Sequence, residues 1–427
     1  MSGPTAFDRL LERWREQHVR QAPRAGSVRV VDVEVLRRGR PGLVDVVAEV
    51  DGSLAHAVLG VRRPGEELRV LGALDEPTLG TLEDEEGVGI VVDALRDAGA
   101  ARLLLGAVAG TSVEAVRDVS VVSLVRDDDE ATALVFDRRY TLTVFPWLTR
   151  GPHPGATLLA GLDAAGFNHL PAPLAFWRRS GRDLGIVQEL LAGASSGWAL
   201  AIGSLRDVIA SGVSPDLAGG DFAPEALALG TMAARMHLAL DRAFGREAGE
   251  VAEWVDALRP EVLALTAAAR AGPARTGLGP SGGVAPLEDE RGPGAARVGD
   301  VEGDSEYVTS TEALLEALRR SGLRLPTIRT HGDFHLGRTA RTDHGWVLAD
   351  YMPGGATPGS VGPIFRCPLA DVADLTWSLH HAAEVAAGER GPAPASTRAA
   401  ELAAAWEARN HRAFLAAYLA TPGIHSL

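Results

Sequence analysis

The chain changes its hydrophobic period near its middle, and this order of patterns limits the folds open to it. Up to about residue 190, short runs of alternating or clustered apolar residues are broken by Gly and Pro, as antiparallel strands are. From Trp198 onward, apolar residues recur at helical spacing in long amphipathic runs. Strands first and helices afterwards predict an α+β protein, with a mixed N-terminal part and a helical C-terminal part.

The strand-forming runs fall into two groups, with helical patterns before, between and within them. The first group comprises Ser27–Val35, Leu43–Val50, Leu54–Val61 and Leu68–Leu71. The second comprises Val116–Val125, Ala133–Phe136, Tyr140–Phe145, Leu174–Trp177 and Leu184–Leu190. Helices are expected over the amphipathic start Met1–Gln21, over Gly87–Ala98 and Ala101–Val108, and from about Pro154 to Ala165.

The second half is predicted to be mostly helical, with one insertion of a different character. The expected helices are Trp198–Ile209, Pro224–Ala243, Val251–Ala271, Ser310–Ser321, Leu369–Ala387 and Ser396–Leu419. A short strand is expected over Gly345–Asp350. Residues 271–303 consist of Gly, Pro, Ala, Arg and acidic residues with scarcely an aromatic, which predicts a flexible insertion.

Composition narrows the function classes. The formal net charge of −14 argues against a nucleic-acid partner, because such binding depends on an excess of basic residues. A single cysteine, Cys367, excludes an intramolecular disulfide and a cysteine metal cluster. With no signal peptide and no apolar run long enough to span a membrane, we expect a cytoplasmic protein. All 42 basic residues are arginine, so any mechanism that needs a lysine is excluded.

The sharpest motif is the HGDFHLG run at His331–Gly337, which is followed by Trp346–Asp350. Taken singly, Asp333 and Asp350 are ordinary turn or cap residues. Together, with Asp333 in a loop and Asp350 at the end of a short strand, they match the pair of carboxylates that phosphoryl transfer uses. One carboxylate accepts the proton of the attacking hydroxyl, which is the role expected of Asp333. The other holds the Mg²⁺ that bridges the nucleotide phosphates, the role expected of Asp350.

With these motifs the sequence resembles the maltokinase branch of the aminoglycoside-phosphotransferase-like kinases, and the related glucosamine kinases. The resemblance implies a bilobal, protein-kinase-like fold. It would consist of a cap subdomain at 1–110, the remainder of the nucleotide-binding lobe at 111–195, and a helical lobe at 196–427. It implies ATP and Mg²⁺ as cofactors and a sugar acceptor, either maltose at its anomeric hydroxyl or an amino sugar such as glucosamine. A partner enzyme of α-glucan metabolism is a further possibility that it raises.

The resemblance also implies roles for individual residues. Adenine would contact the hinge residues Glu189, Leu190 and Leu191. The catalytic loop would be supported by His331, His335 and Asp371. The sugar pocket would be bordered by Trp406, Glu407, Arg409 and Tyr418, with Trp406 as a stacking platform.

The nucleotide lobe departs from the family pattern in its charges. Thr143 stands where the family has the lysine that pairs the phosphates, and with no lysine in the chain only an arginine such as Arg138, Arg139 or Arg150 could replace it. The helix beginning at Pro154 lacks the glutamate that would pair that lysine. The loop expected to cover the phosphates, Asp127–Glu130, carries four carboxylates, which repel a triphosphate unless cations intervene.

The metal site departs as well. Arg338 stands where the family has a second metal ligand, a glutamine, and a cation there competes with Mg²⁺. The run Asp350–Gly355 also lacks the family's acid after the aspartate. Arg338 could instead contact a nucleotide phosphate.

Three functional hypotheses therefore stay open. The first is an active sugar kinase in which Asp333 is the base. The second is a catalytically impaired pseudokinase that binds a sugar, a nucleotide or a partner protein. The third is a kinase with an altered donor or acceptor. His380, His381 and His411 are interpreted as solvated or core histidines, because no third metal ligand has supporting spacing.

Overall fold

The computed structural model describes most of the chain, and divides it into two compact units. It describes residues 6–18, 28–65, 71–72, 78–110, 118–128, 130–191, 193–252, 255–256, 316–351, 365–388 and 394–427. Unit 1 comprises Met1–Asp163, Leu170–Ala194 and Tyr351–Gly362. Unit 2 comprises Ala164–His169, Ser195–Asp350 and Pro363–Leu427. The expected insertion at 271–303 lies outside the described residues, and among those described no helix is long and apolar enough to cross a membrane.

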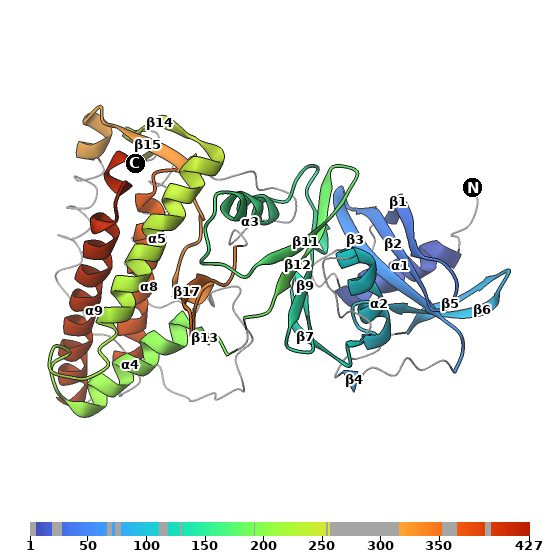
Figure 1. The fold of residues 1–427 in the computed structure, drawn as a ribbon, viewed down its shortest axis with the longest axis horizontal. Coiled ribbons are helices and arrows are strands. Elements are labelled where there is room, and N and C mark those ends of the chain that lie inside the picture. The colour runs from blue at the N-terminus through green and yellow to red at the C-terminus, as the bar shows by residue number, and fades with distance from the viewer. Residues whose placement is uncertain are drawn as a thin grey trace. The chain divides into compact units, whose positions relative to one another are not determined.

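Unit 1 begins with an antiparallel sheet that is covered by the first helix (Figure 1). Along the sheet the strands are β1 (Val28–Arg37), β2 (Gly42–Val50), β3 (Ser53–Arg62), β6 (Gly87–Asp93) and β5 (Thr78–Asp84), with β10 (Trp147–Leu148) pairing with β3. Helix α1 (Ala6–His18) inserts Leu10, Leu11 and Trp14 into the core on this sheet. This apolar stripe, visible in the sequence, is what fixes the helix there.

A second sheet completes unit 1. In order along the sheet its strands are β11 (Pro173–Arg179), β12 (Arg182–Glu189), β9 (Tyr140–Val144), β8 (Thr132–Phe136), β7 (Val121–Asp127) and β4 (Leu71–Gly72). Helix α2 (Ala98–Ala109) contacts strands of both sheets, and α3 (Pro154–Ala164) follows β10. Asp97 caps α2, since its carboxylate accepts the N–H of Ala100 at 2.8 Å.

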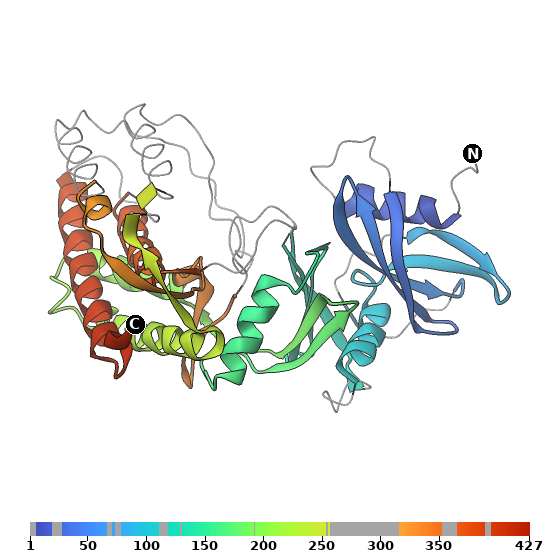
Figure 2. The same ribbon diagram turned by 90° about the horizontal axis from the view of Figure 1, so that it is seen from above.

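The helix expected over Gly87–Ala98 is wrong. Residues Gly87–Asp93 form strand β6, which pairs with β3 on one side and β5 on the other. The run Ile90–Val92 is β-branched and favours a strand, and a Cβ at Gly89 would lie 2.8 Å from a methyl of Val61. Strand β5, which the sequence analysis missed, forms a hairpin with β6 that extends from the edge of the sheet (Figure 2).

In the part of unit 2 that the structure describes, four long helices form where the sequence predicted them. They are α4 (Gly197–Ser211), α5 (Ala223–Phe244), α8 (Leu369–Gly388) and α9 (Pro394–Ala420). Helix α9 runs along α5 (Figure 1). At Gly230 an added Cβ would lie 2.2 Å from the carbonyl oxygen of Phe414, so the two helix backbones touch there. The helices expected at Val251–Ala271 and Ser310–Ser321 lie largely outside the described residues.

Two small sheets and two short 3-10 helices complete unit 2. One sheet has the order β13 (Ser195–Ser196), β16 (Thr339–Thr342), β17 (Gly345–Leu348), and the other β14 (Arg246–Glu250), β15 (Arg324–Arg329), β18 (Phe365–Arg366). The 3-10 helices are η3 (Leu336–Arg338) and η4 (Ile424–Ser426). The α+β class is thus confirmed. The three-part division at 110 and 195 stays a prediction, although one boundary between the compact units falls between Ala194 and Ser195.

Candidate active site

The HGDFHLG run forms a tight loop between β15 and η3 that is anchored on a buried aspartate of α8. Asp371 accepts the N–H of His331 at 2.8 Å through Oδ2 and the N–H of Gly332 at 2.9 Å through Oδ1. Gly332 has φ of +86°, a conformation that glycine adopts without strain. One fully buried carboxylate therefore sets the path of the backbone just before Asp333.

The anchor is itself held by a histidine and a tyrosine. His237 of α5 donates from Nε2 to Asp371 over 3.1 Å, and its Nδ1 lies 2.9 Å from the hydroxyl of Tyr418 on α9. Burial alone would raise the pKa of Asp371, but the hydrogen bonds from His237 and from the loop N–H groups lower it. Asp371 is therefore an ionised acceptor within the helical core.

His331 links the loop to the end of β17. Its Nδ1 accepts the N–H of Asp333 at 3.3 Å, and its Nε2 donates to the carbonyl of Asp350 over 2.9 Å. Burial lowers the pKa of His331, so the ring is neutral in the tautomer that these two hydrogen bonds require. His335, the other expected support, accepts the N–H of Gly337 at 3.1 Å.

Arg338 joins the two aspartates of the motif. Its Nε and Nη2 donate to Asp333 Oδ2 at 3.1 and 2.7 Å, and its Nη1 pairs with Asp350 Oδ2. Burial would raise the pKa of Asp333, but nearby His335 and the hydrogen bonds and charge of Arg338 hold this pKa well below its usual range. The structure thus brings Asp333, Asp350 and Arg338 into one cluster, in which Asp333 stays ionised.

This arrangement does not fit the Mg²⁺ expected at Asp350. Mg²⁺ demands near-octahedral oxygen ligands at close range, and here a guanidinium takes one oxygen of each aspartate. Among the described residues, no group of three His, Cys, Asp or Glu side chains could hold a metal ion. We therefore derive no chemical step through a metal.

Of the residues expected to bind the nucleotide, Thr143 and the hinge residues 189–191 lie in unit 1, whereas Arg338 lies in unit 2. Thr143 is half-buried in the middle of β9, between Ala133 and Ile186 of the flanking strands. At the end of β12, the N–H of Glu189 donates to Ala172 at 3.0 Å and that of Leu190 to Arg139 at 2.8 Å, while the carbonyl of Leu191 accepts from Ala194 at 3.3 Å. These two N–H donors of the expected hinge are thus already used within unit 1.

Cations near the expected phosphate loop pair with the loop itself. Arg126 binds Asp128 at 2.6 Å and Glu130 at 2.5 Å, and Arg96 pairs with Asp127. The repulsion expected from this loop is therefore offset by arginine for its three described acids. Of the arginines considered as substitutes for the lysine, Arg139 lies over the ring of Tyr140, 5.1 Å from its centroid, and Arg150 is exposed. Arg138 lies in the β8–β9 turn with φ of +55°.

The residues expected to border the sugar pocket lie on α9 and point to different neighbours. Trp406 has no exposed surface and donates to Ser204 of α4 at 3.2 Å, so its ring offers no face to a sugar. Tyr418 is likewise buried beside His237. Glu407 lies 3.1 Å from His380 Nδ1, and Arg409 pairs with Asp221. The structure therefore does not gather these four side chains into one pocket.

The sequence analysis missed two residues of α8 that lie one and two turns beyond Asp371. Burial raises the pKa of Asp374 to about 6, with added repulsion from Asp371 and Asp333. Trp377 is 65% exposed and lies beside His380, with ring centroids 5.1 Å apart. The spacing 371, 374, 377 places all three residues along one stripe of the helix, which the sequence could have revealed.

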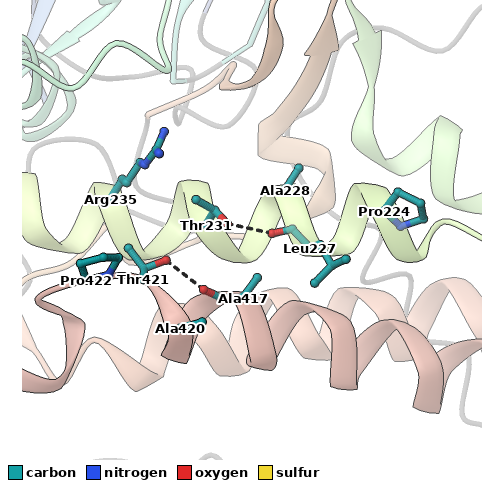
Figure 3. Close-up of a pocket in the computed structure, with 9 residues that line it drawn as sticks. All are labelled: Pro224, Leu227, Ala228, Thr231, Arg235, Ala417, Ala420, Thr421 and Pro422. Atoms are coloured by element: carbon teal, nitrogen blue, oxygen red, sulfur yellow. Dashed lines mark hydrogen bonds between the residues drawn. The ribbon is translucent and has the colours of Figure 1, made fainter.

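A separate groove of about 570 Å³ lies on α5 and α9 (Figure 3). It is lined by Pro224, Leu227, Ala228, Thr231, Arg235, Ala417, Ala420, Thr421 and Pro422. The hydroxyls of Thr231 and Thr421 donate to carbonyls of their own helices, at 3.2 and 2.9 Å (Figure 3). The groove contains none of the residues expected in the active site, and its lining offers little beyond Arg235 to orient a polar ligand.

Comparison of sequences finds glucosamine kinases. The chain is 29% identical over 295 residues to the glucosamine kinase of Streptacidiphilus jiangxiensis, covering 65% of this chain and 58% of that protein. It is 29% identical over 266 residues to the glucosamine kinase of Mycolicibacterium smegmatis, covering 59% and 58%. The matched segments thus span little more than half the length of these relatives. No protein-family model matches the chain.

Comparison of structures finds the same kind of protein. Crystal form A of a glucosamine kinase superposes with a TM-score of 0.67 at 21% identity, covering 97% of this chain and 85% of that one. A glucosamine kinase in complex with glucosamine, ADP and inorganic phosphate gives a TM-score of 0.64 at 20% identity, with the same coverage. The chain therefore has the kinase-like fold of glucosamine kinases, as the sequence analysis predicted.

Proposed function

We propose that this chain is a sugar phosphotransferase that transfers the γ-phosphoryl group of ATP to a hydroxyl of an amino sugar of the glucosamine class. The fold and the sequence relatives support a sugar kinase. The observation that carries the proposal is the catalytic loop, in which buried Asp371 binds the N–H groups of His331 and Gly332 and presents Asp333 at the loop surface.

Asp333 is suited to receive an acceptor hydroxyl. Its side chain is 30% exposed, and Arg338 holds its Oδ2 while its Oδ1 lies 3.7 Å from His335 Nε2. Its lowered pKa keeps it ionised, so it accepts a hydrogen bond from the hydroxyl and orients it. Such a weak base takes the proton late, which suits a loose phosphoryl transition state. Asp333 thus serves first to position the acceptor.

Amino sugars are favoured over maltose as acceptors because the relatives found are glucosamine kinases. The acidic side chains of the site add support. Asp333 lies near enough to Asp374 to raise the pKa of Asp374 through charge repulsion. A protonated amino group relieves such repulsion, whereas a neutral disaccharide does not. Maltose therefore serves as the comparison substrate.

A second candidate is a binding protein that holds a sugar, a nucleotide or a partner enzyme without turnover. One observation favours it: Arg338 already pairs with both aspartates that a metal-dependent kinase would use. The lack of any lysine, with uncharged Thr143 at its expected place, points the same way. Binding without product formation would separate this candidate from the kinase.

The test is sugar-dependent release of ADP from ATP by the full chain, with glucosamine and maltose in parallel. We expect turnover with glucosamine, and a loss of about 10²–10⁴-fold in Asp333→Asn, the range for a positioned acid–base group. Asp343→Asn, an exposed aspartate in the β16–β17 turn, is the matched control and should keep full activity. Turnover that survives in Asp333→Asn would refute the role of this residue. An inactive wild-type chain that still binds ATP would support the second candidate.

A further inference from the structure

We infer that Arg338 is the resident cation of the catalytic loop: it takes the place of a divalent ion between Asp333 and Asp350, and the wild-type cluster binds no Mg²⁺. The Arg338 guanidinium contacts both carboxylates. Its Nε and Nη2 donate to Asp333, and its Nη1 pairs with Asp350. The inference concerns the chain's own charges and holds whether or not it turns over ATP.

Burial makes this cation hard to displace. The Arg338 side chain has no exposed surface, whereas those of Asp333 and Asp350 are 30% and 20% exposed. A guanidinium stays charged in proteins, so a metal ion that took its oxygens would leave a buried cation without its partners. The guanidinium is thus buried behind the two aspartates. A metal ion arriving from solvent meets carboxylates that already pair with this guanidinium.

The backbone fixes Arg338 at both ends of the cluster. Its N–H donates to the carbonyl of His335 at 2.9 Å, on the side of the catalytic loop. Its carbonyl accepts the N–H of Ala349 at 2.8 Å and that of Asp350 at 3.3 Å, on the side of the strand end. The backbone of Arg338 is therefore held between the two segments that carry the aspartates.

The charges of the cluster determine how strongly it attracts a divalent metal ion. Within the cluster, the guanidinium offsets one of the two carboxylate charges and repels a strongly hydrated divalent ion at the same oxygens, an effect that nearby Asp374 does not remove. Replacing the arginine by a neutral amide removes the guanidinium from both carboxylates and adds an oxygen ligand. The substitution Arg338→Gln is therefore expected to create a divalent site that the wild-type chain lacks.

The experiment uses Mn²⁺ alone as the probe, with free Mn²⁺ measured by electron paramagnetic resonance on the full chain. We expect wild type and Asp350→Asn to bind Mn²⁺ equally weakly, through general surface acids. Arg338→Gln should gain one site at least about tenfold tighter, built from carboxylate and amide oxygens. The double variant Arg338→Gln/Asp350→Asn should lose it. Arg341→Gln, three residues further along in β16 and paired with Glu225 at 3.2 Å, should behave as wild type.

Two results would overturn the inference. One is a wild-type Mn²⁺ site that Asp350→Asn or Asp333→Asn abolishes. The other is a folded Arg338→Gln, by circular dichroism, that gains no site. If Arg338→Gln does not fold, the comparison of wild type with the two aspartate variants still decides the matter. None of these measurements uses ATP or a sugar, so they remain distinct from the test of the phosphotransferase proposal.

Discussion

Unit 1 and unit 2 each contain a buried ion-pair network, and the two networks are arranged in opposite ways. In unit 1 the acid is enclosed: Asp45 and His56 have no exposed side-chain surface, and Arg179 reaches Asp45 at 2.9 Å while also pairing with exposed Glu34. In unit 2 the cation is enclosed, since Arg338 has no exposed side-chain surface while its two acids are partly exposed. In the unit 1 network the buried partner is thus the acid, whereas in the unit 2 cluster the buried partner is the arginine and the acids are exposed in part.

This difference indicates that the Asp45 network stabilises the fold, whereas the Arg338 cluster is placed to contact a ligand. The Asp45 network ties strands together, because His56 lies 2.8 Å from Asp45 on β2 and 3.0 Å from the carbonyl of Phe145. Within that network Asp45 is fully buried, and the exposed acids, such as Glu34, lie at its edge. The Arg338 cluster instead presents its acids outward, where an acceptor can reach Asp333. Substitutions in the Asp45 network should accordingly affect folding alone, whereas substitutions in the Arg338 cluster should affect function.

The largest expected effect comes from Asp371→Asn, which changes the anchor of the catalytic loop. The amide replaces one oxygen by an N–H₂ group that faces backbone N–H donors or His237, so a buried charge network loses a partner. We expect the free energy of unfolding to fall by about 3–5 kcal/mol. Phosphotransfer activity should fall at least about 10²-fold as the loop shifts. Urea denaturation and the ADP assay measure both quantities.

The control for that substitution is Asp207→Asn, an exposed aspartate on α4, which should leave both quantities unchanged. If Asp371→Asn retained full activity, the loop would not depend on its anchor, and the contrast between the two networks would fail.

Next in size is Asp45→Asn in unit 1. It leaves Arg179 and His56 with a weaker partner inside the sheet, and we expect a loss of about 3 kcal/mol in the free energy of unfolding. The kcat/KM for phosphotransfer should not change at temperatures where the variant is folded. Thermal unfolding by calorimetry, together with the ADP assay, measures this. Glu34→Gln, at the exposed rim, should cost less than about 0.5 kcal/mol; a drop in kcat/KM for Asp45→Asn would contradict a purely structural role.

The smallest effect concerns Asp374, whose pKa is raised to about 6 by burial and by nearby acids. Its protonated form is favoured in the folded state, so its stabilising contribution is complete below pH 4 and is lost as the pH rises through 6. Asp374→Asn should therefore be more stable than wild type by about 1 kcal/mol above pH 7, after allowance for partial exposure, and equal to it near pH 3. Urea titrations at both pH values measure the difference, which should not appear for Asp207→Asn.

Much of the fold and of the loop was predictable because the signals were local. The run His331–Gly337 carries its own glycine for the positive φ at Gly332, and helical spacing gave the four long helices of unit 2. The family resemblance implied that Asp371 supports the loop, and the structure places it in contact with that loop. Patterns of this kind need no information from distant parts of the chain.

The remainder depended on long-range contacts. Gly87–Asp93 became a strand because β3 and β5 pair with it, and Trp406 became a core residue because Ser204 and Phe222 pack beside it. Arg338 was recognised as an unfavourable neighbour for Mg²⁺. Its pairing with both aspartates, however, depends on how η3 and the end of β17 approach each other. Periodicity carries no information on such approaches.

The bond between His237 and Tyr418, which joins residues 181 positions apart, also bears on how the chain is made. Synthesis runs from the N-terminus at about 5–20 residues per second, and segments fold as they emerge. The catalytic loop and Asp371 leave the ribosome before Tyr418 does, so the anchor of the loop remains incomplete until α9 has been translated and has packed against α5 at Gly230. The loop that carries Asp333 therefore acquires its complete anchor only after α9 has been released.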